Sequence, residues 1–198
     1  MLNEEERVKH FYLTLLAMFG LVSSVEASFP VSCAPELRSV WETIQKLPEA
    51  RQLIQSVVAE GPLHVEVNRH LTTKFGAFWT GDARAILVNP PRPGNDRGET
   101  IGSILFELHN ALADRELTRL DEQAESGQIS KQRYIEAVER IEYRNSINAS
   151  RIARTGIVQG LFPATAHLPT YPTFEEHYRV QQEAGHSAWI GRTYDQLR

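Results

Sequence analysis

Apolar residues recur every three or four positions along much of the chain, which is the pattern of amphipathic helices. The strongest pattern starts near Glu99 or Thr100 and spans more than three helical turns. We expect this helix to continue through the polar segment 115–125 and to break at residues 126–127. Its apolar positions are Ile101, Ile104, Leu105, Leu108, Ala111 and Leu112.

Further helices are predicted on both sides of this segment. Ser32 is placed to cap a helix over residues 37–47, and a second short helix over 53–58 stops at residues 61–62. Ser130 is placed to cap a helix that returns antiparallel to the long one, and a last helix starts near Thr173. The apolar positions expected to face inward after Ser130 are Tyr134, Ile135, Val138 and Ile141.

Strand patterns lie in the middle of the chain. Residues 63–68 alternate between apolar and polar, and residues 75–79 and 84–89 are β-rich runs joined by a short turn, which predicts a hairpin. We expect the Pro- and Gly-rich residues 90–98 to form a surface loop. Because the strands are grouped between helices, we expect an α+β fold in which a small antiparallel sheet, a hairpin plus one strand, packs against a long helical hairpin.

Composition restricts the class of protein. The chain has 198 residues, a formal net charge of -4 and one cysteine, Cys33. This length suits one domain, or a short processed segment followed by one domain. The charge argues against nucleic-acid binding, and a single cysteine excludes an internal disulfide framework and a cysteine-based zinc ribbon.

The N-terminus has features of a signal peptide. Residues 11–22 form an apolar run too short to span a bilayer, and small residues precede a cleavage position after Ala27. We therefore expect residues 1–27 to be removed and 28–198 to form one secreted or periplasmic domain without stable membrane insertion. The three acidic residues Glu4, Glu5 and Glu6 depart from the usual positive charge, and the alternative is an amphipathic helix packed on the core.

The long helix carries a motif that resembles the active-site helix of zincin metallopeptidases. A hairpin, a loop and then an amphipathic helix is the order found in that family, and the helix here reads Phe106-Glu107-Leu108-His109-Asn110. In the family pattern H-E-x-x-H, two histidines bind zinc and the glutamate activates the bound water. Glu107 matches the general base, whereas Phe106 and Asn110 occupy the histidine positions. The resemblance, over residues 63–145, implies a zincin-like domain that has lost its zinc ligands.

Helical geometry selects the candidate catalytic residues. Each residue advances about 100 degrees, so Glu107, Asn110 and Asp114 fall on one side of the helix and His109 lies nearer its apolar face. Glu107 would act as the base and Asn110 would position a substrate, with His109 as a further candidate. The alternative for the three polar residues is an ordinary solvated helix face. For His109 it is a place at the edge of the core.

Other candidates lie beyond the motif. If the site has a third acidic group, as gluzincins do, it is Glu139 or Glu142, and we include Glu142 among the catalytic candidates. His177 and His186 form an alternative zinc set, although a spacing of nine residues is not a recognised ligand spacing.

Each of these residues also has a simpler explanation. Glu142 would otherwise pair with Arg140 or Arg144. Cys33, expected at a helix start, is the basis of an alternative cysteine-dependent hydrolase.

These features predict an exported zincin-like pseudoenzyme or protein-binding factor with a residual acidic cleft. We expect no cofactor, with zinc disfavoured, and a protein or peptide as the partner. Any activity would be that of a metallopeptidase-like hydrolase. The alternative is a secreted interaction module without enzymatic ancestry, in which residues 90–98 and 162–173 frame a binding groove.

Overall fold

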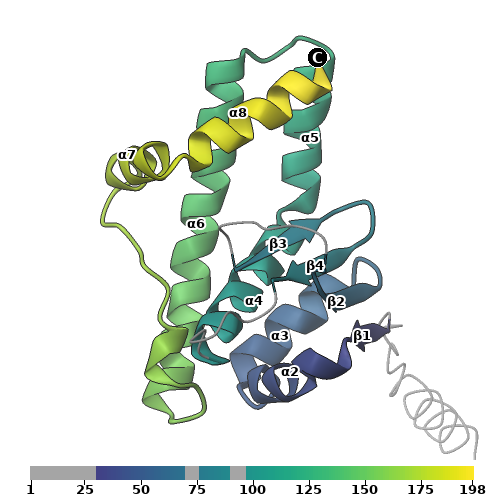
Figure 1. The fold of residues 1–198 in the computed structure, drawn as a ribbon, viewed down its shortest axis with the longest axis vertical. Coiled ribbons are helices and arrows are strands. Elements are labelled where there is room, and N and C mark those ends of the chain that lie inside the picture. The colour runs from purple at the N-terminus through teal and green to yellow at the C-terminus, as the bar shows by residue number, and fades with distance from the viewer. Residues whose placement is uncertain (1–29, 70–75, 90–96) are drawn as a thin grey trace, which may run out of the picture.

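The protein has an α+β fold with a four-stranded sheet (Figure 1). The computed structural model describes residues 30–69, 76–89 and 97–198. The sheet has the order β1-β2-β4-β3, and its strands are Val31–Cys33, Leu63–Val67, Ala85–Val88 and Ala77–Thr80 in that order. β3 and β4 form the expected antiparallel hairpin. The sheet is nevertheless mixed rather than antiparallel, because β4, the second strand of the hairpin, lies next to β2 and runs parallel to it.

β1 replaces the helix start that was expected at Ser32. Ser32 is paired in register with His64 of β2, and its Oγ lies 2.7 Å from His64 Nδ1. Helical structure starts after Ala34 with the short 3-10 helix η1 (Pro35–Leu37), which leads into α2 (Arg38–Ile44). The prediction of a Ser32 cap was therefore wrong, because parallel pairing with β2 holds these residues extended.

The remaining helices follow the predicted order with two differences. α4 and α5 are separate helices that meet at Ala113, where one continuous helix was expected. α8 was not predicted. It starts directly after Gly185, which has a left-handed backbone conformation with φ 81°. The side chains of Ser130 and Thr173 cap α6 and α7 by accepting hydrogen bonds from backbone N–H groups. The helices are α3 (Pro48–Val58), α4 (Arg97–Leu112), α5 (Asp114–Glu125), α6 (Lys131–Val158), the 3-10 helix η2 (Ala164–Ala166), α7 (Phe174–Ala184) and α8 (His186–Leu197).

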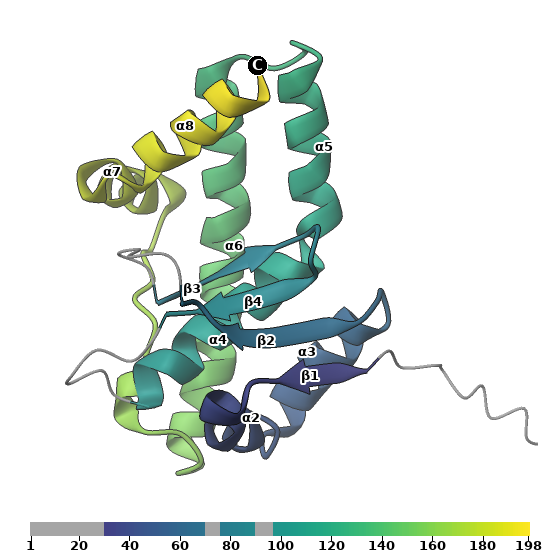
Figure 2. The same ribbon diagram turned by 45° about the vertical axis from the view of Figure 1, so that its right-hand side comes forward.

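Two apolar clusters pack along α6, the longest helix. The first core cluster joins the sheet, α2, α3 and α4 with the C-terminal half of α6, and includes the apolar face predicted for α4. The second core cluster joins α5, α8 and the N-terminal half of α6, and its buried members are Ala124, Tyr134, Val138 and Ile190. Figure 2 shows α6 extending beyond the sheet to meet α5 and α8. The middle of α6 therefore lies between two apolar regions.

Some predictions concern residues that the structure does not describe. Residues 1–27, the expected signal peptide, and most of the loop 90–98 lie outside the described residues. None of the helices within residues 30–69, 76–89 and 97–198 combines the length and apolar composition needed to cross a bilayer.

Candidate functional site

The middle of α6 carries buried polar side chains where the two apolar clusters meet. Glu139 and Asn145 are almost completely buried, with 0% and 3% of their surface exposed. Buried acidic groups oppose folding unless they are paired, so they are uncommon outside functional sites. Residues from α4, α7 and the start of α8 complete this polar region.

Glu107 of α4 lies directly beneath strand β3. Its Oε2 accepts hydrogen bonds from the backbone N–H of Trp79 and from Asn110 Nδ2, both at 2.9 Å. Asn110 Oδ1 in turn accepts a hydrogen bond from Asn145 Nδ2 of α6 at 2.9 Å. Asp114, one turn further along, accepts a hydrogen bond from Trp79 Nε1 at 2.6 Å. The interpretation of these positions as a solvated helix face was therefore wrong for Glu107 and Asn110, which are buried and connect α4 to β3 and α6. Asp114, the first residue of α5, is half-buried and contacts β3.

Burial changes the protonation of Glu107. Only 5% of its surface is exposed, and this burial raises its pKa from 4.5 to about 8. The hydrogen bonds from Asn110 and Trp79 oppose the rise, whereas the negative charge of Glu142 adds to it. Glu107 is consequently protonated near pH 7, which does not favour the role of general base that the motif implied.

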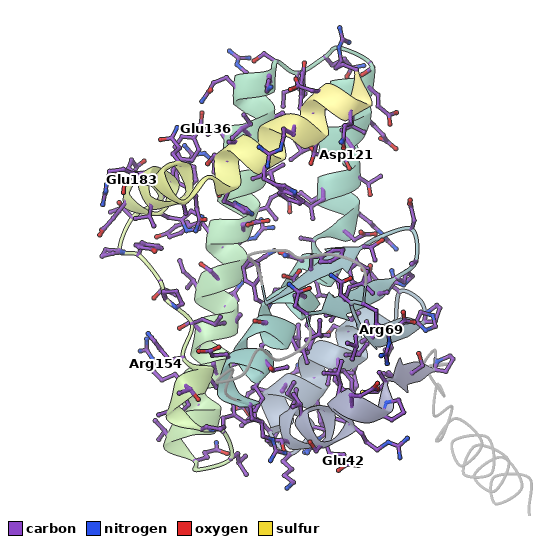
Figure 3. All side chains as sticks on the ribbon, in the orientation of Figure 1. Glu42, Arg69, Asp121, Glu136, Arg154 and Glu183 are labelled. Atoms are coloured by element: carbon purple, nitrogen blue, oxygen red, sulfur yellow. The ribbon has the colours of Figure 1, made fainter. Side chains whose placement is uncertain are left out.

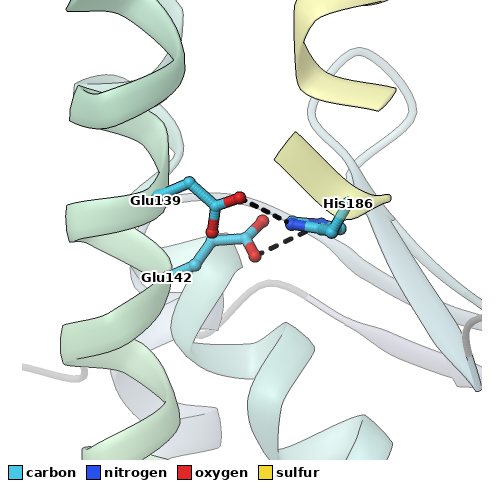
Figure 4. Close-up of side chains that lie close together, drawn as sticks. All are labelled: Glu139, Glu142 and His186. Carbon is cyan, nitrogen blue, oxygen red and sulfur yellow. Dashed lines mark hydrogen bonds and ion pairs between the residues drawn. The ribbon is translucent and has the colours of Figure 1, made fainter. Parts of the chain in front are cut away.

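A second group of acid–base residues lies on α6 and α8 (Figure 4). His186, the first residue of α8, places Nδ1 3.1 Å from Glu139 Oε1 and Nε2 3.5 Å from Glu142 Oε2. Ser187 Oγ donates a further hydrogen bond to Glu139 Oε1 at 2.6 Å. His186 therefore lies between the two carboxylates, which stand three residues apart on one face of α6.

His177 of α7 reaches Glu139 from another direction. Its Nε2 lies 3.4 Å from Glu139 Oε2, close enough for an ion pair but without hydrogen-bond geometry. The side chain is buried, and its ring packs against the rings of Tyr143, Tyr171 and Phe174. Neither ring nitrogen of His177 has a hydrogen-bond partner among the described residues.

The charges of these groups are coupled. Burial acts to raise the pKa of Glu139, but interactions with His177, His186 and Ser187 outweigh it and lower the pKa to about 2. Burial raises the pKa of Glu142. Burial acts to lower the pKa of His186, but the neighbouring carboxylates outweigh burial and raise it. Glu107 also interacts electrostatically with Glu142 and His186, so the charges of the two groups influence each other.

Glu142 has a different partner from the one expected of a surface residue. Arg140 pairs with Glu136, and Arg144 pairs with Glu116. The prediction of an ion pair between Glu142 and either arginine was wrong, because Glu142 faces inward toward His186.

His109 is not brought together with the other candidates. Its charged neighbour is Arg151 of α6, and none of the hydrogen bonds or charge interactions of Glu107 involves it. Burial lowers the pKa of His109 to about 4, so the imidazole is neutral at physiological pH. This environment matches a histidine at the edge of the core, which was the alternative to a catalytic role.

The two histidine positions of the zincin motif are occupied by residues that pack or form hydrogen bonds within the fold. Phe106 packs against the first core cluster, and Asn110 holds Glu107 and Asn145. Neither side chain is a usual zinc ligand. The motif positions on α4 therefore do not form a zinc site of the H-E-x-x-H kind.

Cys33 lies in strand β1 rather than at a helix start. Burial raises the pKa of its thiol, which disfavours the reactive thiolate. Within the described part of the chain, its one hydrogen bond goes to the Ala34 carbonyl, and no histidine interacts with it. The environment of Cys33 thus offers no support for a cysteine-dependent hydrolase.

Sequence reasoning placed Glu107, Asn110 and Glu142 in one candidate site and His177 and His186 in an alternative zinc set. It did not predict that these two histidines meet Glu139, or that His186 meets Glu142. The spacing of Glu139 and Glu142, three residues apart on one helix face, was the available signal. Ser187, whose hydroxyl contacts Glu139, was missed because it lies at the start of α8, a helix that was not predicted. Trp79 was missed because it contacts Glu107 through its backbone N–H rather than its side chain. The chain gave no match to a protein-family model, to a curated protein or to a solved structure.

Proposed function

We propose that this protein is a zincin-like domain that has lost the zinc chemistry of its motif helix and serves to bind a protein or peptide. The observation that carries the proposal is the state of Glu107. It is buried, protonated near neutral pH and held by the backbone of β3 and by Asn110, which stands where the family has its second histidine. A carboxyl group in this state supports the fold of the site but does not activate water.

An exposed aromatic side chain beside the buried acidic groups supports a binding role. The ring of Trp189 stacks on His186 with ring centroids 5.8 Å apart, and 45% of its surface is exposed. Tryptophan is enriched among the residues that contribute most to binding at protein interfaces. Trp189 is therefore the residue through which a partner would reach the site.

The proposal is tested with the full chain on an array of random-sequence peptides, with Trp189→Ala as the variant. We expect a subset of peptides to bind, and the variant to weaken their binding about tenfold or more. Ile147→Ala removes another exposed apolar side chain, 41% exposed, and should leave binding unchanged. The proposal fails if no peptide binds, or if Trp189→Ala and Ile147→Ala behave alike.

A hydrolase is the second candidate, because buried titratable residues from α4, α6 and α8 converge as they do in active sites. Mass spectrometry of the peptides after incubation separates the two functions. Intact peptides support the binding protein. Cleavage that is lost in Glu107→Gln supports the hydrolase and refutes the pseudoenzyme.

Export belongs to the same proposal and has its own test. The apolar run at residues 11–22 and the compact residues before position 28 support removal of residues 1–27. Expression in a bacterial host with N-terminal sequencing of the periplasmic fraction should give a chain that starts at Ser28. Recovery of only the uncleaved chain from the cytoplasm would contradict export.

A further inference from the structure

Two carboxylates and an imidazole converge in the middle of the protein. Glu139 and Glu142 project from the same face of α6, and His186 projects toward them from the start of α8. Donor atoms of the three residues all lie within 4.8 Å of one another. Figure 4 shows the three side chains pointing toward one another. This arrangement offers one imidazole nitrogen and two carboxylate oxygens from rigid helices.

The spacing suits a first-row transition metal. Such ions bind imidazole nitrogen and carboxylate oxygen at about 2.1 Å, which places neighbouring tetrahedral ligands about 3.4 Å apart. The 3.5 Å between His186 Nε2 and Glu142 Oε2 already matches this value. Since the ligand atoms of all three residues lie within 4.8 Å of one another, side-chain rotations would complete the coordination.

His177 and Glu139 provide an independent sign that the cluster is built for a ligand. Glu139 is fully buried, yet its Oε2 has no hydrogen-bond partner among the described residues. His177 is 3% exposed and turns its Nε2 toward that oxygen at 3.4 Å, again without a hydrogen bond. Buried polar atoms are almost always hydrogen-bonded in folded proteins. Glu139 Oε2 instead has a single ion-pair contact at 3.4 Å, so this buried oxygen retains the capacity to bind a further ligand.

Charge also favours a cation at this position. Glu139 and Glu142 stand beside each other, and their charge partners among the described residues are His177 and His186. A histidine gives up its proton when it binds a metal ion, so the ion would take over the positive charge. Arg140 and Arg144, the nearest arginines along α6, are both engaged with glutamates at the surface. Buried carboxylates at this density are stabilised by a bound cation.

We propose that Glu139, Glu142 and His186 bind one divalent transition-metal ion, Zn²⁺ or Mn²⁺, and that His177 orients Glu139 for this purpose. The site lies on α6 and α8, away from the motif positions Phe106 and Asn110 on α4. Imidazole ligation selects these ions over Mg²⁺ and Ca²⁺, which prefer oxygen ligands only. The proposal does not depend on the peptide-binding function.

The first test is calorimetric titration of the full, metal-stripped chain with ZnCl₂ and with MnCl₂. We expect one ion per chain with at least one of the two metals, and no comparable binding of MgCl₂. Glu142→Gln and His186→Gln should each weaken binding about tenfold or more, since each removes a ligand. His177→Gln should weaken it less, because His177 acts through Glu139.

The matched control is Glu136→Gln. Glu136, labelled in Figure 3, lies on the same helix, one turn before Glu139. Its side chain is 41% exposed and forms a surface ion pair with Arg140. This variant should bind metal as tightly as the wild type. If Glu136→Gln and Glu142→Gln have the same affinity, or if the wild type binds neither Zn²⁺ nor Mn²⁺, the proposal is overturned.

A spectroscopic measurement keeps the test informative if His186→Gln does not fold. Co²⁺ added to the metal-stripped wild-type chain should give visible absorption bands typical of nitrogen and oxygen ligands and a coordination number below six. Zn²⁺ should displace the Co²⁺ and abolish these bands. Bands identical to those of Co²⁺ in water would contradict the site. Ile147→Ala, which changes an exposed side chain without a role in either proposal, should retain the bands. The bands are recorded without peptide, so a failure of the peptide-binding proposal is distinguished from a failure of the metal site.

Discussion

Replacing Glu107 with glutamine should make the protein much more stable at pH 8 but only slightly more stable near pH 5. Glutamine has the shape of the protonated carboxyl group, and its side-chain oxygen can accept the hydrogen bonds from Trp79 N and Asn110 Nδ2. It carries no charge at any pH. The variant therefore removes only the cost of ionising a buried carboxyl group.

The magnitude follows from the pKa of Glu107 in the two states. In the unfolded chain the group has its ordinary pKa of 4.5, and in the folded protein the pKa is about 8. Below pH 4.5 the group is protonated in both states and costs nothing. As the pH rises toward 8, the unfolded chain loses the proton and the folded protein keeps it, so each pH unit favours unfolding by about 1.4 kcal/mol. The accumulated loss at pH 8 is about 4 kcal/mol.

Urea unfolding followed by circular dichroism measures this difference. The wild type and Glu107→Gln are compared in the presence of a chelator at about pH 5, 6, 7 and 8, which covers the span between the two pKa values. The gap between their free energies of unfolding should widen steadily with pH in favour of the variant. Glu136→Gln, which changes a half-exposed carboxylate on α6, should show no such trend.

Two results would refute the reasoning. One is a gap that stays constant from pH 5 to pH 8, which would mean that Glu107 has an ordinary pKa in the folded protein. The other is a variant less stable than the wild type at pH 8, which would mean that the ionised carboxylate is stabilised by its neighbours. In either case Glu107 would be available as a base near neutral pH, and the pseudoenzyme proposal would lose its main support.

Three further predictions concern the first core cluster, the N-terminal cap of α7 and the burial of His109. Ile104→Ala removes a fully buried side chain from the first core cluster and should lower the free energy of unfolding by about 3 kcal/mol in urea titrations. Thr173→Ala removes the side chain that caps α7 and should cost about 1 kcal/mol in the same assay, whereas Thr173→Ser should cost little. His109 should titrate near pH 4 in NMR spectra, and a midpoint near its ordinary 6.5 would show that it is not buried as described.

The strongest local patterns predicted the corresponding elements correctly. The apolar positions predicted for α4 are buried, except Leu112, which is half-buried at the end of the helix. A periodicity of 3.6 residues over several turns defines a single apolar face, and that face packs inward. Ser130 and Thr173 cap their helices because a cap depends only on the next three residues. The hairpin of β3 and β4 likewise follows from two short runs and the turn between them.

Elements that depend on distant partners were not predictable in this way. β1 is only three residues long and is extended because it pairs with β2, about thirty positions later in the chain. The break between α4 and α5 at Ala113 has no proline or glycine to mark it. α8 starts at His186 without a capping side chain, and its inner face is recognisable only once α5 and α6 are in place.

The sequence by itself determined the helices with strong periodicity, the hairpin, and a carboxylate at Glu107 on the helix that follows it. Tertiary structure alone decided that Glu107 lies under Trp79, that Glu139 and Glu142 face inward, and that His186 meets them. The physical reason is the range of the interactions. Helix and turn signals act within a few residues, whereas the site joins positions up to about eighty residues apart, whose meeting depends on how α4, α6 and α8 pack.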